Sequence, residues 1–174
     1  MRPIVIITKL NAGGMERFCS TLCNTFHLQG RFYTLCALHA APAVGSREWL
    51  LSGIDYIELD CSARFAAPRL TRLCRGRPGD TVLALGLEIC ALLVMLKRLG
   101  LISNPIVYRE STAVLAHCTP FWKWIIRKFV SGADGLIVQS RQALTELGRL
   151  FEVRQPARLI RNPCAFVNRG VSED

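Results

Sequence analysis

The feature that most constrains the fold of this chain is a repeated alternation of short apolar runs with amphipathic segments. Short β-rich runs are typical of buried strands, whereas apolar residues spaced three and four apart indicate helices. The expected strands are 3–8, 32–38, 55–59, 80–85, 106–109, 135–138 and 158–160. The expected helices are a first one between Gly14 and Gly30, then 47–51, 68–74, 87–99, 121–130 and 141–150. Alternating strands and helices are joined by parallel crossovers, so the sequence predicts an α/β, Rossmann-like, doubly wound and mostly parallel sheet with helices on both faces.

The chain is expected to hold one domain. Its 174 residues can enclose a single substantial core. After Arg161-Asn162-Pro163 the sequence becomes polar and loses its periodic pattern. We therefore assign residues 1–163 to the domain and residues 164–174 to a linker stub.

The charge of the chain points to phosphate-rich partners. It carries 22 basic and 13 acidic residues, a formal net charge of +9. Most of the cations are arginines, whose planar guanidinium groups suit phosphate oxyanions. Nucleotide-sugars, lipid phosphates and an anionic membrane surface all fit this charge. Nucleic acid fits it too, but no nucleic-acid-binding motif accompanies the charge, so nucleic acid is not an expected partner.

The cysteines and the apolar segments indicate a reduced, cytoplasmic protein without a structural metal. Cys19, Cys23, Cys36 and Cys90 fall on apolar stretches and are expected to be core thiols. No tight Cys-x2-Cys pair suggests zinc, and no metal or other cofactor is expected. The first apolar run is too short for a secretory leader, and the most membrane-like stretch, 81–96, is interrupted by Gly86 and Glu88.

A glycine pair follows the first expected strand, in the turn Asn11-Ala12-Gly13-Gly14. Such turns lie outside the carboxyl ends of parallel strands, where a helix N-terminus favours an anion and glycine lets a ligand come close to the backbone. The turn is a candidate phosphate site, with an ordinary tight turn as the alternative. Neither Gly-x-Gly-x-x-Gly nor a phosphate loop ending in Gly-Lys-Ser/Thr is present, which disfavours dehydrogenases and simple nucleotidases.

The run Lys9-Leu10-Asn11-Ala12-Gly13-Gly14-Met15-Glu16-Arg17 resembles the first strand-to-helix turn of family-4 GT-B glycosyltransferases. Two later stretches resemble the same family: 133–140, a late strand ending in serine, and 159–163, a strand end with Asn-Pro that leads into a second domain. The resemblance implies the N-terminal, acceptor-binding half of a retaining, metal-independent enzyme that transfers a sugar from a nucleotide-sugar to a glycan or lipid-linked acceptor.

The same resemblance implies that the donor-binding half is missing. In this family a carboxy-terminal domain holds the nucleotide-sugar, usually with two glutamates separated by seven residues. No two glutamates of this chain have that spacing. We therefore expect a C-terminal donor domain as a partner, and we expect the chain alone to be inactive. A non-catalytic Rossmann-like partner or a membrane-docking subunit is the alternative.

The resemblance also assigns site residues. Gly13 and Gly14 would approach the donor phosphates through their backbone N–H groups. Glu16 and Arg17 would orient the loop or reach the cleft, or else form an exposed first turn in which Glu16 complements the helix dipole. Ser140, and Asn162 at the last strand end, are further cleft candidates.

A second candidate site is the strand end Tyr108-Arg109-Glu110-Ser111. Arg109 and Glu110 are candidate catalytic or acceptor-binding residues, because opposite charges at this edge suit a sugar hydroxyl or a phosphate. A local ion pair at the strand end is the alternative.

Two basic segments are candidates for an anionic membrane surface. Arg69, Arg72 and Arg75 lie on or directly beside the expected helix 68–74, with Arg64 and Arg77 on either side of it. The second segment, 121–129, mixes tryptophan and phenylalanine with lysine and arginine. For that segment we expect a core helix that buries four apolar side chains and leaves its cations in solvent. Those four are Phe121, Trp124, Ile125 and Phe129.

Overall fold

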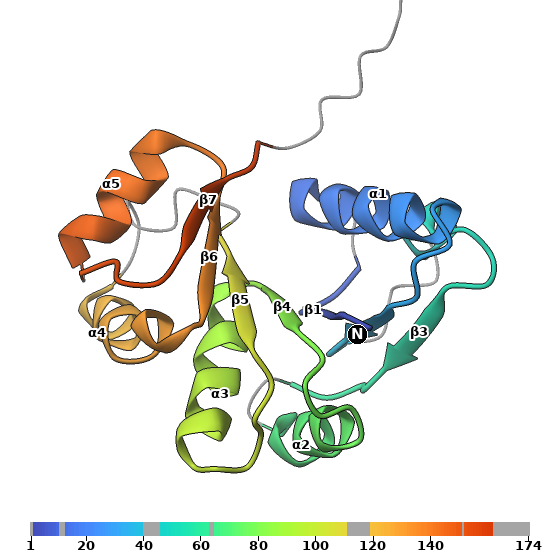
Figure 1. Cartoon of the computed structure of the whole chain (residues 1–174), viewed down its shortest axis with the longest axis horizontal. Coiled ribbons are helices and arrows are strands. Elements are labelled where there is room, and N and C mark those ends of the chain that lie inside the picture. The colour runs from blue at the N-terminus through green and yellow to red at the C-terminus, as the bar shows by residue number, and fades with distance from the viewer. Residues whose placement is uncertain are drawn as a thin grey trace, which may run out of the picture.

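A seven-stranded, entirely parallel sheet forms the centre of the protein (Figure 1). The computed structural model describes residues 2–10, 13–39, 46–62, 65–110, 119–150 and 152–161. The strand order is β3-β2-β1-β4-β5-β6-β7. The strands are β1 Ile4–Ile7, β2 Thr34–Ala37, β3 Asp55–Glu58, β4 Val82–Leu85, β5 Ile106–Arg109, β6 Gly135–Val138 and β7 Ala157–Leu159. The prediction of an α/β doubly wound sheet is confirmed.

Helices cover the sheet from both sides. They are α1 Gly14–Leu28, α2 Ala67–Arg75, α3 Leu87–Arg98, α4 Pro120–Phe129 and α5 Arg141–Leu150, with short 3-10 segments η1 Ser46–Trp49 and η3 Val130–Gly132. Helix α1 and η1 pack on one face, and α2, α3, η3 and α5 pack on the other (Figure 1). Because parallel crossovers are right-handed, strands added in opposite directions from β1 and β4 place their helices on opposite faces.

The central strands explain why the sequence reads as continuous apolar runs. All four residues of β1 and all four of β2 are buried, since both faces of the sheet are covered there. Val5 and Ile7 pack toward α1, whereas Ile4 and Ile6 pack toward α2 and α3. The expected strand and helix positions are all found, with boundaries shifted by one or two residues in most elements.

Helix α1 ends in a left-handed turn. Gly30, which follows the C-cap residue Gln29, adopts a φ of +66°, and the N–H of Arg31 donates to the carbonyl of Phe26. This left-handed turn is easy for glycine and satisfies carbonyls that the helix end leaves open.

The expectation that α4 buries all four of its apolar side chains is wrong for two of them. Phe121 is 62% exposed and Trp124 is 53% exposed. Ile125 is half-buried, and Phe129 packs against the core. At 100° per residue, Phe121 and Trp124 share a side of the helix with Lys128, whereas Phe129 lies on the side that packs against the core. The helix presents its aromatic pair to solvent because only the opposite side meets the core.

The cysteine prediction is confirmed for the described residues. Cys19, Cys23, Cys36 and Cys90 are buried thiols without disulfide partners. Burial raises the pKa of Cys36 to about 12 and that of Cys74 to about 11, so both stay protonated at neutral pH. Among the described residues, none of the helices has the length and apolar character needed to cross a membrane.

Candidate functional site at the carboxyl edge of the sheet

The strand order reverses between β1 and β4, and this switch opens the carboxyl edge of the sheet. The chain leaves β1 toward α1 on one face and leaves β4 toward α3 on the other. Two glycine turns therefore flank the same opening, one at Gly13-Gly14 and one at Gly86. Gly86 has a φ of +128°, and a Cβ there would lie 3.7 Å from the hydroxyl of Thr8. Doubly wound sheets bind their ligands at this kind of position.

The two glycines that begin α1 differ in their surroundings. A Cβ added to Gly13 would overlap the carboxylate of Glu16. A Cβ added to Gly14 would meet no described atom within 4 Å, and the backbone of Gly14 is not in the left-handed region. The fold itself therefore gives no reason for glycine at position 14. Open space beside a helix N-terminus is what a phosphate group requires.

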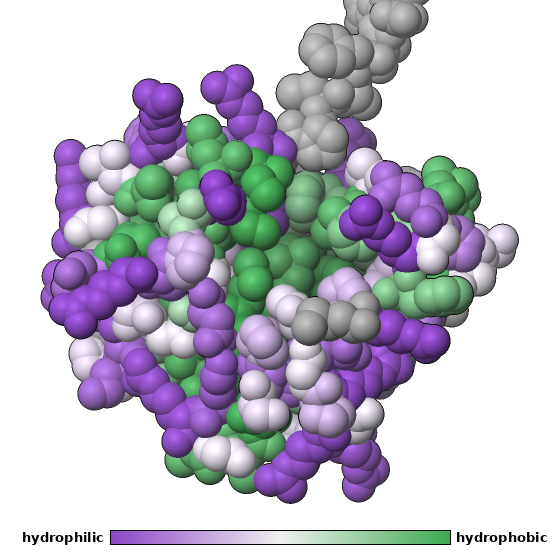
Figure 2. Space-filling model, in the orientation of Figure 1, coloured by the Kyte–Doolittle hydropathy of each residue, from purple (hydrophilic) through white to green (hydrophobic). Residues whose placement is uncertain are grey.

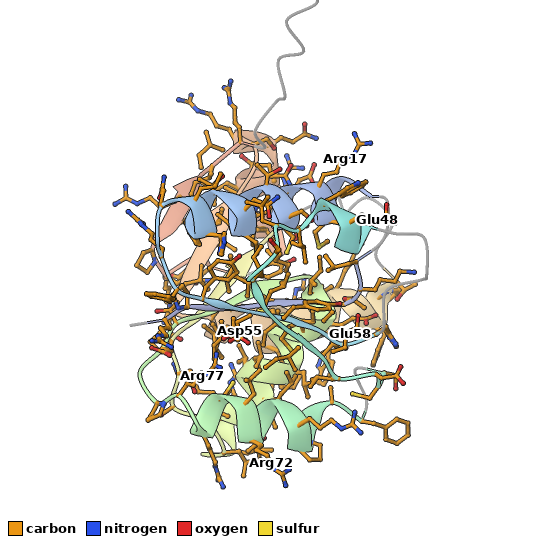
Figure 3. All side chains as sticks on the ribbon, turned by 90° about the vertical axis from the view of Figure 1, so that its right-hand side faces the viewer. Arg17, Glu48, Asp55, Glu58, Arg72 and Arg77 are labelled. Carbon is orange, nitrogen blue, oxygen red and sulfur yellow. The ribbon has the colours of Figure 1, made fainter. Side chains whose placement is uncertain are left out.

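Glu16 and Arg17 lie in the first turn of α1 but point to different places. The carboxylate of Glu16 folds back over Gly13, at the positive end of the helix dipole. The guanidinium of Arg17 lies 5.4 Å from the ring centroid of Trp49 in η1. Figure 3 shows Arg17 beside Glu48 at this end of α1, with Glu58 at the same edge of the sheet. Of the two side chains, Glu16 is thus the one next to the glycine turn.

Arg109 is fully buried at the end of β5, with an exposed fraction of 0%. Its guanidinium carbon lies 3.5 Å from the ring centroid of Phe18 in α1, a close cation–π contact. Burial lowers the pKa of Arg109, and the negative charge of Glu110 opposes that shift. This contact joins the end of β5 to the first turns of α1. The side chain of Arg109 therefore lies on the face of the sheet that α1 covers.

Glu110 leaves the strand on the opposite face. Its carboxylate accepts a hydrogen bond of 2.5 Å from the hydroxyl of Tyr108, whose ring packs in the core with α3. Only 4% of Glu110 is exposed, and its carbonyl accepts a hydrogen bond from Gln139 of the neighbouring strand end. The two predicted site residues are therefore adjacent in sequence but are held by different layers of the protein.

Ser140 has a structural task that the sequence comparison does not reveal. Its hydroxyl accepts a hydrogen bond of 3.0 Å from the N–H of Ala143, which caps the N-terminus of α5. Asn162, Asn11 and Ser111 lie outside the described residues. Gly86, Phe18 and Gln139 are at or beside the edge and were missed by sequence reasoning. Of these, Gly86 could have been predicted from the sequence, because a glycine between an apolar run and a helix often marks a turn.

A hollow lies beside this edge on the α1 side. Val107 of β5 and Ile137 of β6 are half-buried and belong to neither described core cluster, because α1 does not extend over them. Figure 2 shows hydrophobic side chains lining a depression between α1 and strands β6 and β7. Since Arg109 lies between Val107 and the carboxyl edge, the hollow opens next to the glycine turn.

The predicted membrane arginines occupy α2, on the face away from α1. Arg69 donates to the carbonyl of Leu59, and the Nε of Arg75 donates to the carbonyl of Leu101 over 2.8 Å. Arg72 and Arg75 line a groove of about 720 Å³ together with Leu96 and Leu101. Arg77 forms a 3.3 Å ion pair with Asp55 at the opposite end of the strands from Arg17 (Figure 3).

The described residues contain no group of three or more His, Cys, Asp or Glu side chains placed to hold a metal ion. The groups at the edge are instead backbone N–H donors at the start of α1, a buried guanidinium and a buried carboxylate. Such a set can bind an anion and orient hydroxyl groups.

The fold is that of one half of a GT-B glycosyltransferase. No protein-family model matches the chain, and no curated protein matches it in sequence. In structure the chain is similar to the apo form of the lipopolysaccharide outer core galactosyltransferase WaaB. The TM-score is 0.68 at 15% sequence identity, over 94% of this chain and 46% of the transferase. The chain thus spans just under half the length of that enzyme.

Proposed function

We propose that this chain is the N-terminal, acceptor-binding half of a family-4 GT-B glycosyltransferase. The enzyme would be of the hexosyltransferase type and would act with retention of configuration and without a metal ion. It would use a nucleotide-sugar as donor and a glycan or lipid-linked molecule as acceptor. The family-4 assignment, the retention and the metal independence rest on the resemblance of the Gly13-Gly14-Met15-Glu16-Arg17 run and of the later strand ends.

The observation that carries the proposal is Gly14. It begins α1 at the switch point of the sheet, its backbone is not in the left-handed region, and no atom of the described residues lies within 4 Å of where a Cβ would stand. A donor diphosphate that approaches this helix N-terminus would receive hydrogen bonds from backbone N–H groups and favourable interaction with the helix dipole. Glycine at this position then serves the ligand rather than the fold.

The acceptor would lie in the hollow between α1 and strands β6 and β7. Val107 and Ile137 would supply its apolar floor, and the edge above it holds the Arg109–Phe18 stack. Glu110, held by Tyr108, would orient an acceptor hydroxyl at the edge. Catalysis would depend on positioning of the two substrates and on electrostatic stabilisation of the leaving diphosphate.

The partner would be a donor-binding domain that faces the same edge. The similar transferase is about twice the length of the matched region, which supports a second half in addition to the matched one. A cytoplasmic location, at the inner face of the membrane, would suit a nucleotide-sugar donor and a lipid-linked acceptor.

Amide NMR of the labelled chain tests the phosphate site directly. Titration with uridine diphosphate, with other nucleoside diphosphates and with pyrophosphate is expected to shift the amide signals of Gly13 and Gly14. A half site should bind weakly, with a dissociation constant on the order of 1–10 mM. Absence of shifts at both glycines over this range would remove the glycine turn from the donor site.

A transfer assay tests whether the proposed acceptor half can transfer sugar without the donor-binding half. The purified chain is expected to transfer no sugar from a panel of nucleotide-sugars to glycan and lipid-linked acceptors, because most donor contacts would come from the other half. Turnover by the chain alone would contradict its assignment as the acceptor half.

A further inference from the structure

The outer surface of α4 combines exposed aromatic rings with positive charge. Six residues, adjacent around the helix axis at 100° each, are all exposed. In angular order they are Lys123, Arg127, Pro120, Trp124, Lys128 and Phe121. Trp124 therefore lies near the middle of this surface, with cations on both sides. We call these six residues the α4 surface.

The aromatic rings of the α4 surface form an ordered unit. The ring centroids of Phe121 and Trp124 lie 6.4 Å apart with an interplanar angle of 23°, a stacked pair. The rings of Trp124 and Phe129 also form a T-shaped pair with centroids 6.1 Å apart, and Phe129 packs against the core. Because Trp124 contacts Phe129, the exposed aromatic pair is packed against the protein and does not project freely into solvent. Large aromatic side chains in solvent next to one another are typical of a surface that binds something apolar.

The charges around these rings have one sign. The sequence of α4 contains Lys123, Arg127 and Lys128 and no acidic residue. On the neighbouring α3, the guanidinium of Arg98 lies 5.6 Å from the ring centroid of Phe129 and adds a fourth cation at the junction. The nearby acid Asp134 is already paired with Lys97 at 2.6 Å. Charge complementarity therefore selects an anionic partner.

Helix α3 packs beside α4 (Figure 1). Met95 of α3 and Leu99, which directly follows that helix, are exposed, Leu99 by 64%. Neither helix is long and apolar enough to cross a bilayer. A helix with aromatic rings and cations on one surface suits the plane of a membrane interface, where rings enter the acyl boundary and cations contact phosphates.

We propose that the α4 surface docks on an anionic membrane, with Trp124 and Phe121 inserted below the lipid phosphates and Lys123, Arg127 and Lys128 in contact with them. Both α2 and α4 carry basic segments that the sequence offers as candidate membrane surfaces. Two of the three α2 arginines, Arg69 and Arg75, donate to backbone carbonyls, and α2 contains no aromatic residue, so we assign insertion to α4. The proposal concerns lipid binding by this chain and is independent of whether it transfers sugar.

The test is co-sedimentation of the chain with vesicles. Vesicles of phosphatidylcholine and phosphatidylglycerol are compared with vesicles of phosphatidylcholine alone, at low and high salt. The wild type is expected to bind the anionic vesicles and to leave them at high salt. The triple variant Lys123→Gln, Arg127→Gln, Lys128→Gln should bind about a hundredfold more weakly. All three side chains are exposed, so the variant keeps its core.

Two further variants make the test specific. The matched control Arg69→Gln, Arg72→Gln, Arg75→Gln removes the same net charge from α2 and should lose far less binding than the α4 triple variant. The double variant Phe121→Ala, Trp124→Ala keeps every charge and should also lose at least about tenfold. Quenching of Trp124 fluorescence by brominated anionic lipids, with Trp124→Phe as control, should report insertion.

Several outcomes would overturn the proposal. They are no binding of the wild type to anionic vesicles, equal losses for the α2 and α4 triple variants, and unchanged binding of the aromatic double variant. A dimer in analytical ultracentrifugation that Trp124→Ala converts to a monomer would assign the α4 surface to a second copy of the chain instead. None of these results depends on the glycine turn, so they are separate from the diphosphate titration.

Discussion

Replacement of Gly14 by alanine tests whether glycine at this position is required for folding or for ligand binding. A Cβ at this position meets no described atom within 4 Å, and the backbone there suits any residue. A glycine-to-alanine change at such a site stabilises a protein by about 0.4–1 kcal/mol, because the unfolded chain loses freedom. For a domain of this size that corresponds to a rise in melting temperature of about 1–4 °C. The same Cβ would enter the space proposed for the donor phosphates.

Gly148 provides the matched control. It lies inside α5, is exposed, and a Cβ there would also meet no described atom within 4 Å. Gly148→Ala should stabilise the chain by about 1 kcal/mol through helix propensity alone. Both variants are expected to melt higher than the wild type, but only Gly14→Ala should lose the diphosphate-induced amide shifts, and Gly14→Val should lose them as well.

The assay is thermal unfolding together with the diphosphate titration of all four proteins. If Gly14→Ala binds uridine diphosphate as the wild type does, the open space at Gly14 has no role in phosphate binding. If it unfolds more easily by over about 1 kcal/mol, the argument that the fold does not need this glycine is refuted.

Three further predictions concern Glu16 and Ser140 at the carboxyl edge and Asp134 at the opposite ends of the strands. Glu16→Gln should tighten diphosphate binding about fourfold per phosphate charge, because a like charge about 5 Å away costs about 0.8 kcal/mol in water; unchanged or weaker binding in the titration would contradict this. Ser140→Ala should lower the free energy of unfolding in urea by about 1 kcal/mol and leave the titration unchanged, since the hydroxyl caps α5. With Asp134→Asn, the free energy of unfolding should fall less steeply as the pH is lowered. Burial raises the pKa of Asp134, but the N–H of Ile106 and the ammonium of Lys97 lower it more, for a net decrease. The folded pKa thus lies below the ordinary value of 3.8, so the contribution of Asp134 is present above that value and disappears as the pH falls through the folded pKa. Urea unfolding across this acid range should show a shallower decline for the variant than for the wild type.

The fold was predictable because its signals are local. Runs such as Ile4–Ile7 can only be buried on both sides, and the helices between them carry apolar residues at helical spacing. Right-handed crossovers then leave few topologies. The glycine turn was also readable, since a glycine pair between a strand and a helix has a definite place in such a sheet.

The candidate site was predictable only in part. Arg109 and Glu110 were located at the strand end, but alternate side chains of a strand point to opposite faces, so adjacency in sequence does not bring them together. The contact of Arg109 with Phe18 depends on how α1 packs on the sheet, whereas Glu110 and Tyr108 share a face of one strand end and meet locally. Ser140 matched a family pattern, but its hydroxyl caps the N-terminus of α5.

The sequence by itself determined the order of the elements, the parallel sheet and the position of the glycine turn, because each follows from short-range periodicity and backbone preference. Only the tertiary structure decided which side of α4 meets the core, and therefore that Phe121 and Trp124 are exposed rather than buried. Apolar residues cover more than half of the circumference of that helix, more than its contact with the core buries, so its periodicity fits more than one orientation. The packing of α3 against α4 selects one of them, since a helix buries the side on which its neighbours lie.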